Sequence, residues 1–276
     1  MTTLSDVKYF LRLFIIFNKK HYIMTRKLFF VFLLFLNTFF ISGQRPEADA
    51  FKLKKGNLVI QPILHGTLVL QYEGNVIYVD PYGGAEAFSG IAKPNLILIT
   101  DIHGDHLNEN TLDALKTEGI KIVVPQAVAD QISEKYHSQL VILANGEQSK
   151  QLGIGIEAIP MYNLPESADA KHVKGRGNGY LLQIGKKKVY ISGDTADIVE
   201  MRELKDIDIA FVCMNLPYTM NIEQAASVVL DFKPKVVYPY HYRGNPDMSD
   251  TEAFKKLVNE QNPEIEVRLR NWYPEY

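Results

Sequence analysis

The sequence predicts a layered α/β domain in which mixed β-sheets are covered by helices on their outer faces. Short apolar runs come first as a meander, helical segments are then interleaved with strands, and the C-terminal third alternates strand with helix. Of the 276 residues, 46% are hydrophobic and 22% are charged, which is ordinary globular composition with ample length for one complete core. No second domain is indicated.

Apolar runs bounded by glycine, asparagine and proline predict the strands. They cover residues 58–64, 68–72, 76–79, 96–100, 120–124, 140–143, 155–159, 179–184, 188–191, 209–214, 236–240 and 264–268. Helical spacing and end signals predict four helices. These helices cover residues 111–116 (capped by Asn110), 127–136, 222–231 and 251–259.

The first 55 residues differ from the rest. A basic stretch, Thr25-Arg26-Lys27, precedes the apolar run 28–41 and the small pair Ser42-Gly43, which is the layout of a secretory signal peptide. Fourteen helical residues reach about 21 Å, short of a roughly 30 Å hydrocarbon core, so a cleaved signal is favoured over a spanning helix. We expect Met24 to be the true start, residues 1–43 to be an extension and signal peptide, 44–55 a linker and 56–276 the domain. The mature protein is then periplasmic or secreted, without a stable membrane anchor.

The net charge and the cysteine content exclude other classes. A formal charge of −2 gives no electrostatic reason to expect a nucleic-acid partner, so the expected partner is a small-molecule substrate. The single cysteine, Cys213, excludes an internal disulfide framework.

The segment after the predicted strand 96–100 carries the chemistry. It offers two carboxylates and two imidazoles within six residues: Asp101, His103, Asp105 and His106. These are nitrogen and oxygen donors suited to divalent zinc, iron or manganese. Gly104 allows the tight turn that lets the donors converge.

This segment resembles the His-x-His-x-Asp-His signature of the metallo-β-lactamase superfamily, with Asp101 in place of the first histidine. The later markers follow in order. Gly193-Asp194-Thr195 resembles the turn whose carboxylate bridges two metals, and His241 matches the last histidine ligand. The resemblance spans residues 58–268 and implies a four-layer αβ/βα sandwich with a metal-dependent hydrolase activity.

Two early turns resemble those of the lactonase-like branch, which includes ascorbate-6-phosphate lactonase and N-acyl phosphatidylethanolamine phospholipase D. Val79-Asp80-Pro81 is similar to its Asp-Pro turn, and Leu64-His65-Gly66 to its Gly-His-type turn.

The resemblance also implies the ligand sets. The second metal position has a full set: Asp105, His106, Asp194 and His241. The first has Asp101, His103 and Asp194, but Met161-Tyr162-Asn163 stands where the family places its third histidine. Asn163 through its carbonyl oxygen, or His172 if its loop folds back, are the two candidates for the missing ligand. With a weak amide ligand, one tight and one loose ion are expected.

The cofactor expected from these donors is zinc, as one or two ions. Manganese or iron is the alternative, because a third carboxylate favours harder ions. The implied chemistry is attack by a metal-bound hydroxide, with Asp105 and His106 as catalytic residues. His65, Arg176 and Tyr218 are weaker candidates for substrate binding. For His65 the alternative is a turn residue, and for Arg176 a solvated basic loop.

The leading hypothesis is therefore an exported metal-dependent hydrolase of a small ester, lactone or phosphoester. The alternative is a catalytically degenerate metal-binding or interaction protein that keeps the fold. A redox enzyme is disfavoured because no second domain is indicated.

Overall fold

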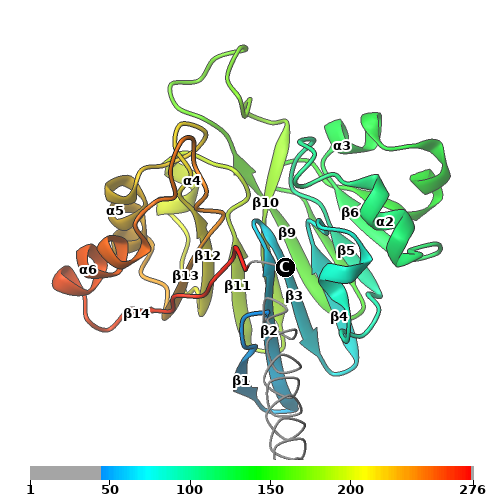
Figure 1. Ribbon diagram of the computed structural model, residues 1–276, viewed down its shortest axis with the longest axis horizontal. Helices are drawn as coiled ribbons and strands as arrows, with labels where there is room; N and C mark the ends of the chain where they lie inside the picture. Colours follow the sequence, from blue (N-terminus) through cyan, green and yellow to red (C-terminus); the bar gives the residue numbers. More distant parts are fainter. Residues whose placement is uncertain (1–44, 275–276) are drawn as a thin grey trace, which may run out of the picture. The chain divides into compact units, whose positions relative to one another are not determined.

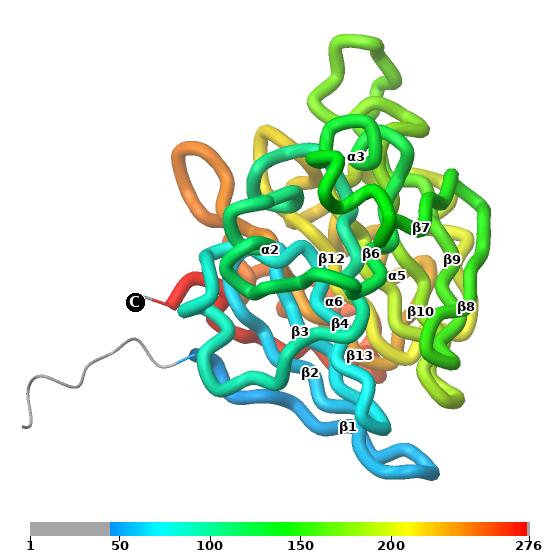
Figure 2. Tube along the Cα trace, turned by 90° about the vertical axis from the view of Figure 1, so that its right-hand side faces the viewer, coloured from blue at the N-terminus to red at the C-terminus, as the bar shows by residue number. Residues whose placement is uncertain are grey.

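The computed structural model describes residues 45–274, and these form two seven-stranded sheets flanked by helices (Figure 1). Turned by 90°, the trace shows α2 and α3 in front of the first sheet (Figure 2). The predicted four-layer αβ/βα sandwich of the metallo-β-lactamase fold is confirmed. The N-terminal calls, the signal peptide and the start at Met24, lie outside the described residues.

In both sheets, neighbouring strands are consecutive in the sequence. The first sheet comprises β1 (Asp49–Leu53), β2 (Gly56–Leu64), β3 (Thr67–Tyr72), β4 (Asn75–Val79), β5 (Leu96–Leu98), β6 (Lys121–Val124) and β7 (Leu140–Ile142). The second comprises β8 (Gln148–Gln151), β9 (Ile154–Met161), β10 (Gly177–Ile184), β11 (Lys187–Ile191), β12 (Ile209–Cys213), β13 (Val236–Tyr240) and β14 (Glu266–Val267). In each sheet the first four strands pair in antiparallel fashion. The strands from β4 through β7, and those from β11 through β14, pair in parallel.

The helices fall into two groups, which are interleaved along the chain with the parallel strands of the first and of the second sheet. The first group is η1 (Ala85–Phe88), α2 (Glu109–Leu115), α3 (Gln126–Gln131) and η2 (Glu134–Gln139). The second group is α4 (Val199–Arg202), α5 (Ile222–Phe232) and α6 (Thr251–Gln261). Among residues 45–274, no helix is both long and apolar enough to cross a bilayer.

Alternation along the strands divides the core into two clusters. On β5, Leu96 and Leu98 pack into the cluster shared with the second sheet, whereas Ile97 packs into the cluster that includes Leu112 of α2. Because successive strand residues face opposite sides, a sheet buried on both faces needs an uninterrupted apolar run. The apolar runs that predicted these strands are therefore the ones that build the sandwich.

Two helix predictions need correction. The α2 helix begins earlier than expected, because the side chain of Asn108, and not of Asn110, accepts the hydrogen bond from the Thr111 amide. The predicted helix 127–136 is broken, since Ile132 and Ser133 are extended and Ser133 donates its amide to the Glu109 carboxylate.

The predicted linker 44–55 is also wrong in part, because residues 49–53 form β1 and pair with β2. The Asp49 carboxylate accepts hydrogen bonds from Tyr238 Oη (2.8 Å), Arg268 Nη1 (3.1 Å) and Arg270 Nη2 (2.5 Å). Tyr238 belongs to β13, so this one side chain ties the edge strand of the first sheet to the second sheet. No local sequence signal marks such a contact between residues nearly two hundred positions apart.

We expect Asp49→Ala to lower the free energy of unfolding by about 2 kcal/mol, because it removes the carboxylate that accepts hydrogen bonds from two arginines and from the buried Tyr238 hydroxyl. Urea denaturation of the variant measures this. Asp130→Ala removes an exposed carboxylate that accepts a hydrogen bond from Gln126 on the surface of α3, and it should change stability by less than about 0.5 kcal/mol. Equal stabilities of the two variants would contradict the structural role of Asp49.

Candidate metal centre

The candidate ligands lie at the edge where strands of both sheets end. Asp80 follows β4, the segment 101–106 follows β5, Asp194 follows β11 and His241 follows β13. The strands β4 and β5 are parallel, and so are β11, β12 and β13, so their carboxyl ends meet at one edge of each sheet. Open α/β sheets bind ligands at this edge.

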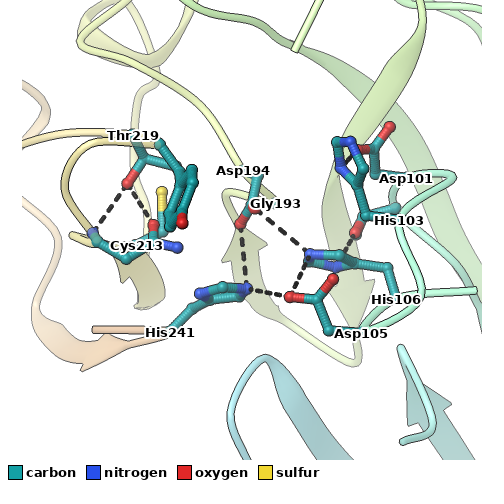
Figure 3. A network of polar contacts seen from close by, with 12 residues as sticks. Asp101, His103, Asp105, His106, Gly193, Asp194, Cys213, Thr219 and His241 are labelled. Carbon is teal, nitrogen blue, oxygen red and sulfur yellow. Dashed lines mark hydrogen bonds and ion pairs between the residues drawn. The ribbon is translucent and has the colours of Figure 1, made fainter. Parts of the chain in front are cut away.

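The ring of His106 is fixed from behind by Asp80. Its Nδ1 lies 2.9 Å from Asp80 Oδ2, and Asp80 in turn accepts hydrogen bonds from the Thr100 amide and hydroxyl, both at 2.7 Å. A carboxylate on one ring nitrogen orients the other nitrogen for a metal. In this orientation, His106 Nε2 points at Asp194 Oδ2, which lies 3.4 Å away (Figure 3).

One group of donors consists of Asp101, His103 and His172. His103 Nδ1 lies 2.5 Å from Asp101 Oδ2, and His172 Nε2 lies 3.8 Å from the same oxygen. His172 Nε2 also lies 3.3 Å from Asp194 Oδ2, so Asp194 adjoins this group as a fourth donor.

Of the two candidates for the missing ligand, the structure brings His172 to the cluster and not Asn163. The side chain of Asn163 is fully engaged: Oδ1 accepts the His172 amide and Nδ2 donates to the Tyr218 carbonyl, both at 2.8 Å. The Asn163 amide also donates to the His172 carbonyl at 2.8 Å. Asn163 therefore acts as the clamp that folds the connection between β9 and β10 back and buries His172.

The other group joins Asp105, His106 and His241 to Asp194. His241 Nε2 lies 3.3 Å from Asp105 Oδ2 and 3.4 Å from Asp194 Oδ1, and all four side chains point toward one another (Figure 3). Gly66 makes this possible, since a Cβ there would stand 2.9 Å from the His241 ring.

The electrostatics favour a cation between these side chains. Burial by itself raises the pKa of Asp194 and lowers that of His106, but their mutual attraction outweighs it. The neighbouring imidazoles of His241 and His106 hold the pKa of Asp194 well below its usual value. Asp194 and Asp80 hold the pKa of His106 well above its usual value. Burial likewise opposes the ionisation of Asp105, yet the neighbouring imidazoles of His241 and His65 lower its pKa overall.

The free atoms fit divalent metal ions. The buried atoms without a hydrogen-bond partner include His106 Nε2, His172 Nε2, His241 Nε2 and Asp194 Oδ1. Buried polar atoms rarely lack partners, so a set that faces one another calls for a ligand. Two ligands bound at 2.0–2.1 Å to one tetrahedral ion are about 3.3 Å apart. The contacts of 3.3–3.4 Å from these imidazoles to Asp194 match that spacing.

The three weaker candidates fall in different places. Arg176 does not line the pocket; its Nε and Nη2 each donate to the Asp101 carboxylate at 3.3 Å, so it neutralises the extra carboxylate instead of facing a substrate. Tyr218 lines the pocket as predicted. His65 lines it too, with Nε2 3.0 Å from Asp105 Oδ2 and Nδ1 2.7 Å from Tyr273 Oη, and burial lowers its pKa.

A pocket of about 250 Å³ opens onto the metal-binding side chains. It is lined by His65, His103, Asp105, Lys171, Asp194, Asn215, Tyr218, His241 and Arg243. Sequence reasoning missed Asn215, Arg243 and the supporting Tyr273, and it treated Asp80 only as a turn. A carboxylate directly after a strand was a usable signal for Asp80, whereas Tyr273 had none.

The description "Beta-lactamase superfamily domain" belongs to the family model that matches residues 60–241, from β2 to the last histidine of the cluster. The chain belongs to this superfamily. Membership extends to a curated group: a UPF0173 metal-dependent hydrolase of Pyrococcus abyssi is 32% identical over 198 residues, covering 67% of this chain and 85% of the relative.

Solved structures of metal-dependent hydrolases are similar to this chain in fold and in sequence. A protein of Parabacteroides distasonis has a TM-score of 0.71 and 38% identity, covering 82% of this chain and 98% of the other. Igni18, a metallo hydrolase from Ignicoccus hospitalis, has a TM-score of 0.65 and 27% identity, covering 79% and 95%. Together with the donor clusters, these relatives establish that the superfamily member described here is a metal-dependent hydrolase.

We expect His172→Ala to lower the metal content by about one ion per chain, because it removes an imidazole from the first group of donors. Elemental analysis after dialysis measures this. His137→Ala removes a histidine of η2 that belongs to none of the donor groups, and it should leave the metal content unchanged. Asn163→Ala should weaken metal retention less than His172→Ala does, because it loosens the clamp but keeps the ligand. Full retention by His172→Ala would show that His172 is not a ligand.

Proposed function

We propose that this hydrolase binds two divalent ions, with zinc as the first candidate, and cleaves a small ester, lactone or phosphoester after export from the cytoplasm. The observation that carries the proposal is the arrangement of two donor groups around one shared carboxylate, Asp194. Sites with two neighbouring metal ions serve hydrolytic reactions in many enzyme families.

The position of His172 changes the expected stoichiometry. With Asn163 as the third ligand, one tight and one loose ion were expected. With His172 in the first group, each group has imidazole and carboxylate donors of the kind that zinc prefers, so two retained ions are expected. Arg176 also neutralises Asp101, which weakens the argument for harder ions such as manganese or iron.

Divalent ions in such a cluster supply a nucleophile at neutral pH by acidifying water, and they attract the negative charge that develops on the reacting group. The chain's own contribution is orientation. Asp105 is the most exposed of the three carboxylates, with 32% of its side chain accessible, and it faces the pocket beside His65 and His241. Asp105 can therefore accept a hydrogen bond from attacking water, and His106 is held rigidly behind it by Asp80.

The placement of His65 supports the lactonase-like branch. Its motif turn lies at the pocket, and the ring contacts both Asp105 and Tyr273 instead of only completing a turn. We therefore favour small cyclic or linear esters and phosphoesters over β-lactams. The degenerate alternative loses its basis, since it rested on a missing histidine that His172 now supplies.

We expect Asp105→Asn and His241→Ala each to lower hydrolysis of p-nitrophenyl acetate, a simple lactone or bis(p-nitrophenyl) phosphate by at least about 100-fold, together with metal content. Steady-state rates and elemental analysis of the same samples measure both. Asp130→Asn, far from the pocket, controls for folding. Unchanged hydrolysis in Asp105→Asn would refute its assignment.

Export is proposed from the basic, apolar and small residues of 26–43. N-terminal sequencing of the native protein should find a start near Gln44 in the periplasm or medium. Leu34→Arg places a charge in the apolar run and should stop processing, whereas Leu34→Ile should not. An intact Met24 on a cytoplasmic product would contradict export.

A further inference from the structure

Two cations line the pocket beside the metal-binding side chains. Lys171 comes from the connection between β9 and β10, and Arg243 from the loop after β13. Among residues 45–274, neither has an ion-pair partner within 4.0 Å. By contrast, two basic residues close to Lys171 in the same connection, Lys174 and Arg176, are each paired with a carboxylate. Lys171 and Arg243 are therefore available to a ligand.

The guanidinium of Arg243 is held at the pocket by Tyr273. It lies 4.1 Å from the centre of the Tyr273 ring, and the Arg243 amide donates to Tyr273 Oη at 2.8 Å. The same hydroxyl lies 2.7 Å from His65 Nδ1. Stacking on an aromatic face leaves the N–H edge of a guanidinium free for a bidentate contact. Arg243 is thus positioned without being neutralised.

Lys171 is held by its own backbone. It precedes the buried His172, and its carbonyl accepts a hydrogen bond from Arg176, which also binds Asp101. The ammonium lies 5.9 Å from the centre of the Tyr218 ring on the same pocket wall. Arg176 therefore holds both Asp101 of the first donor group and the backbone from which the Lys171 side chain extends.

The charge balance of the pocket favours an anion. Its lining carboxylates are Asp105 and Asp194, and both belong to the metal-binding groups. Once cations occupy those groups, the lining carries two further positive charges and no free carboxylate. Such a pocket attracts anions and rejects cations, and the effect weakens with salt.

We propose that the substrate carries an anionic group, a carboxylate or a phosphate, beside the bond that is cleaved, and that Lys171 and Arg243 bind this group. The inference rests on the hydrolase function proposed above and deepens it by naming a substrate class. The pocket, of about 250 Å³, has room for a small anionic group beside the reacting bond. Lys171 and Arg243 are specificity-determining residues here, outside the metal-binding groups.

The first experiment compares two esters of equal acyl length, mono-p-nitrophenyl succinate, which carries a free carboxylate, and neutral p-nitrophenyl butyrate. The readout is the ratio of their kcat/KM values in the metal-loaded protein. We expect the ratio to favour the anionic ester and to fall about tenfold in Lys171→Gln, about tenfold in Arg243→Gln and further in the double variant. Lys150→Gln, an exposed lysine of β8, should keep the wild-type ratio.

The second experiment separates the two anions and does not need turnover. Calorimetric titration of the metal-loaded protein with succinate and with inorganic phosphate gives the affinity for each. In the double variant, the affinity for at least one of the two anions should fall about tenfold or more. The anion whose affinity falls shows whether the site prefers a carboxylate or a phosphate.

The outcomes separate the two proposals. A ratio that stays constant while both esters slow in parallel would overturn the anion site but leave hydrolysis intact. Equal anion affinities in wild type and double variant would overturn it as well. Failure of the wild type to cleave any ester, with anion affinity still dependent on Lys171 and Arg243, would instead refute the proposed ester chemistry and support the anion site.

Discussion

The buried carboxylate of Asp194 is the constraint around which the rest of the site is organised. Ionised carboxylates are costly to bury unless charge partners surround them. Asp194 has three, since the Nε2 atoms of His106, His172 and His241 each lie 3.3–3.4 Å from one of its oxygens. Those nitrogens have no hydrogen-bond partner in the described residues. Neutral imidazoles alone leave the carboxylate uncompensated, and protonated ones repel one another at close range. Cations held between these side chains, which face one another in Figure 3, would satisfy both the carboxylate and the imidazoles, so the packing itself favours a metal.

Three residues of the site adopt a strained backbone conformation. His65, Asp80 and His241 all have positive φ (59°, 44° and 46°), which for non-glycine residues costs of order 1–3 kcal/mol each. Each is held by neighbours that outweigh the strain. The Thr67 hydroxyl donates to the Asp80 carbonyl at 2.6 Å, the His65 amide donates to the Trp272 carbonyl at 2.9 Å, and the His241 amide donates to the His65 carbonyl at 3.3 Å. The first of these bonds lies within the first sheet, and the other two link the His65 turn to the C-terminal segment and to the end of β13 in the second sheet. The conformations of His65 and His241 therefore depend on contacts between segments that meet only in the assembled sandwich.

The parts that could be predicted are those with a local signal. Uninterrupted apolar runs, which suit strands buried on both faces, predict strands such as β5 and β13. The spacing from Asp101 to His106 indicates the metal-binding turn. The parts that could not be predicted depend on contacts between distant residues. Nothing near Asp49 reveals that Tyr238 and two arginines surround it, so β1 was mistaken for a linker. The polar sequence of β8 and the short α4 likewise carried no usable pattern. The choice between Asn163 and His172 was left open for the same reason, because it depends on how a loop folds back.

That loop couples the metal centre to the pocket. Between Asn163 and Arg176, the connection from β9 to β10 supplies a clamp, a candidate ligand, a partner for Asp101 and a pocket cation. It extends beyond the sheets before returning to them (Figure 1), so few strand contacts hold its shape. Binding of a metal to His172 fixes the residue next to Lys171, and it also fixes Asp101, to which Arg176 is bonded. The ordering of the loop is then part of the free energy of metal binding. A metal bound to His172 would further order the residue next to Lys171, and for this reason metal occupancy and recognition of an anionic substrate should rise and fall together.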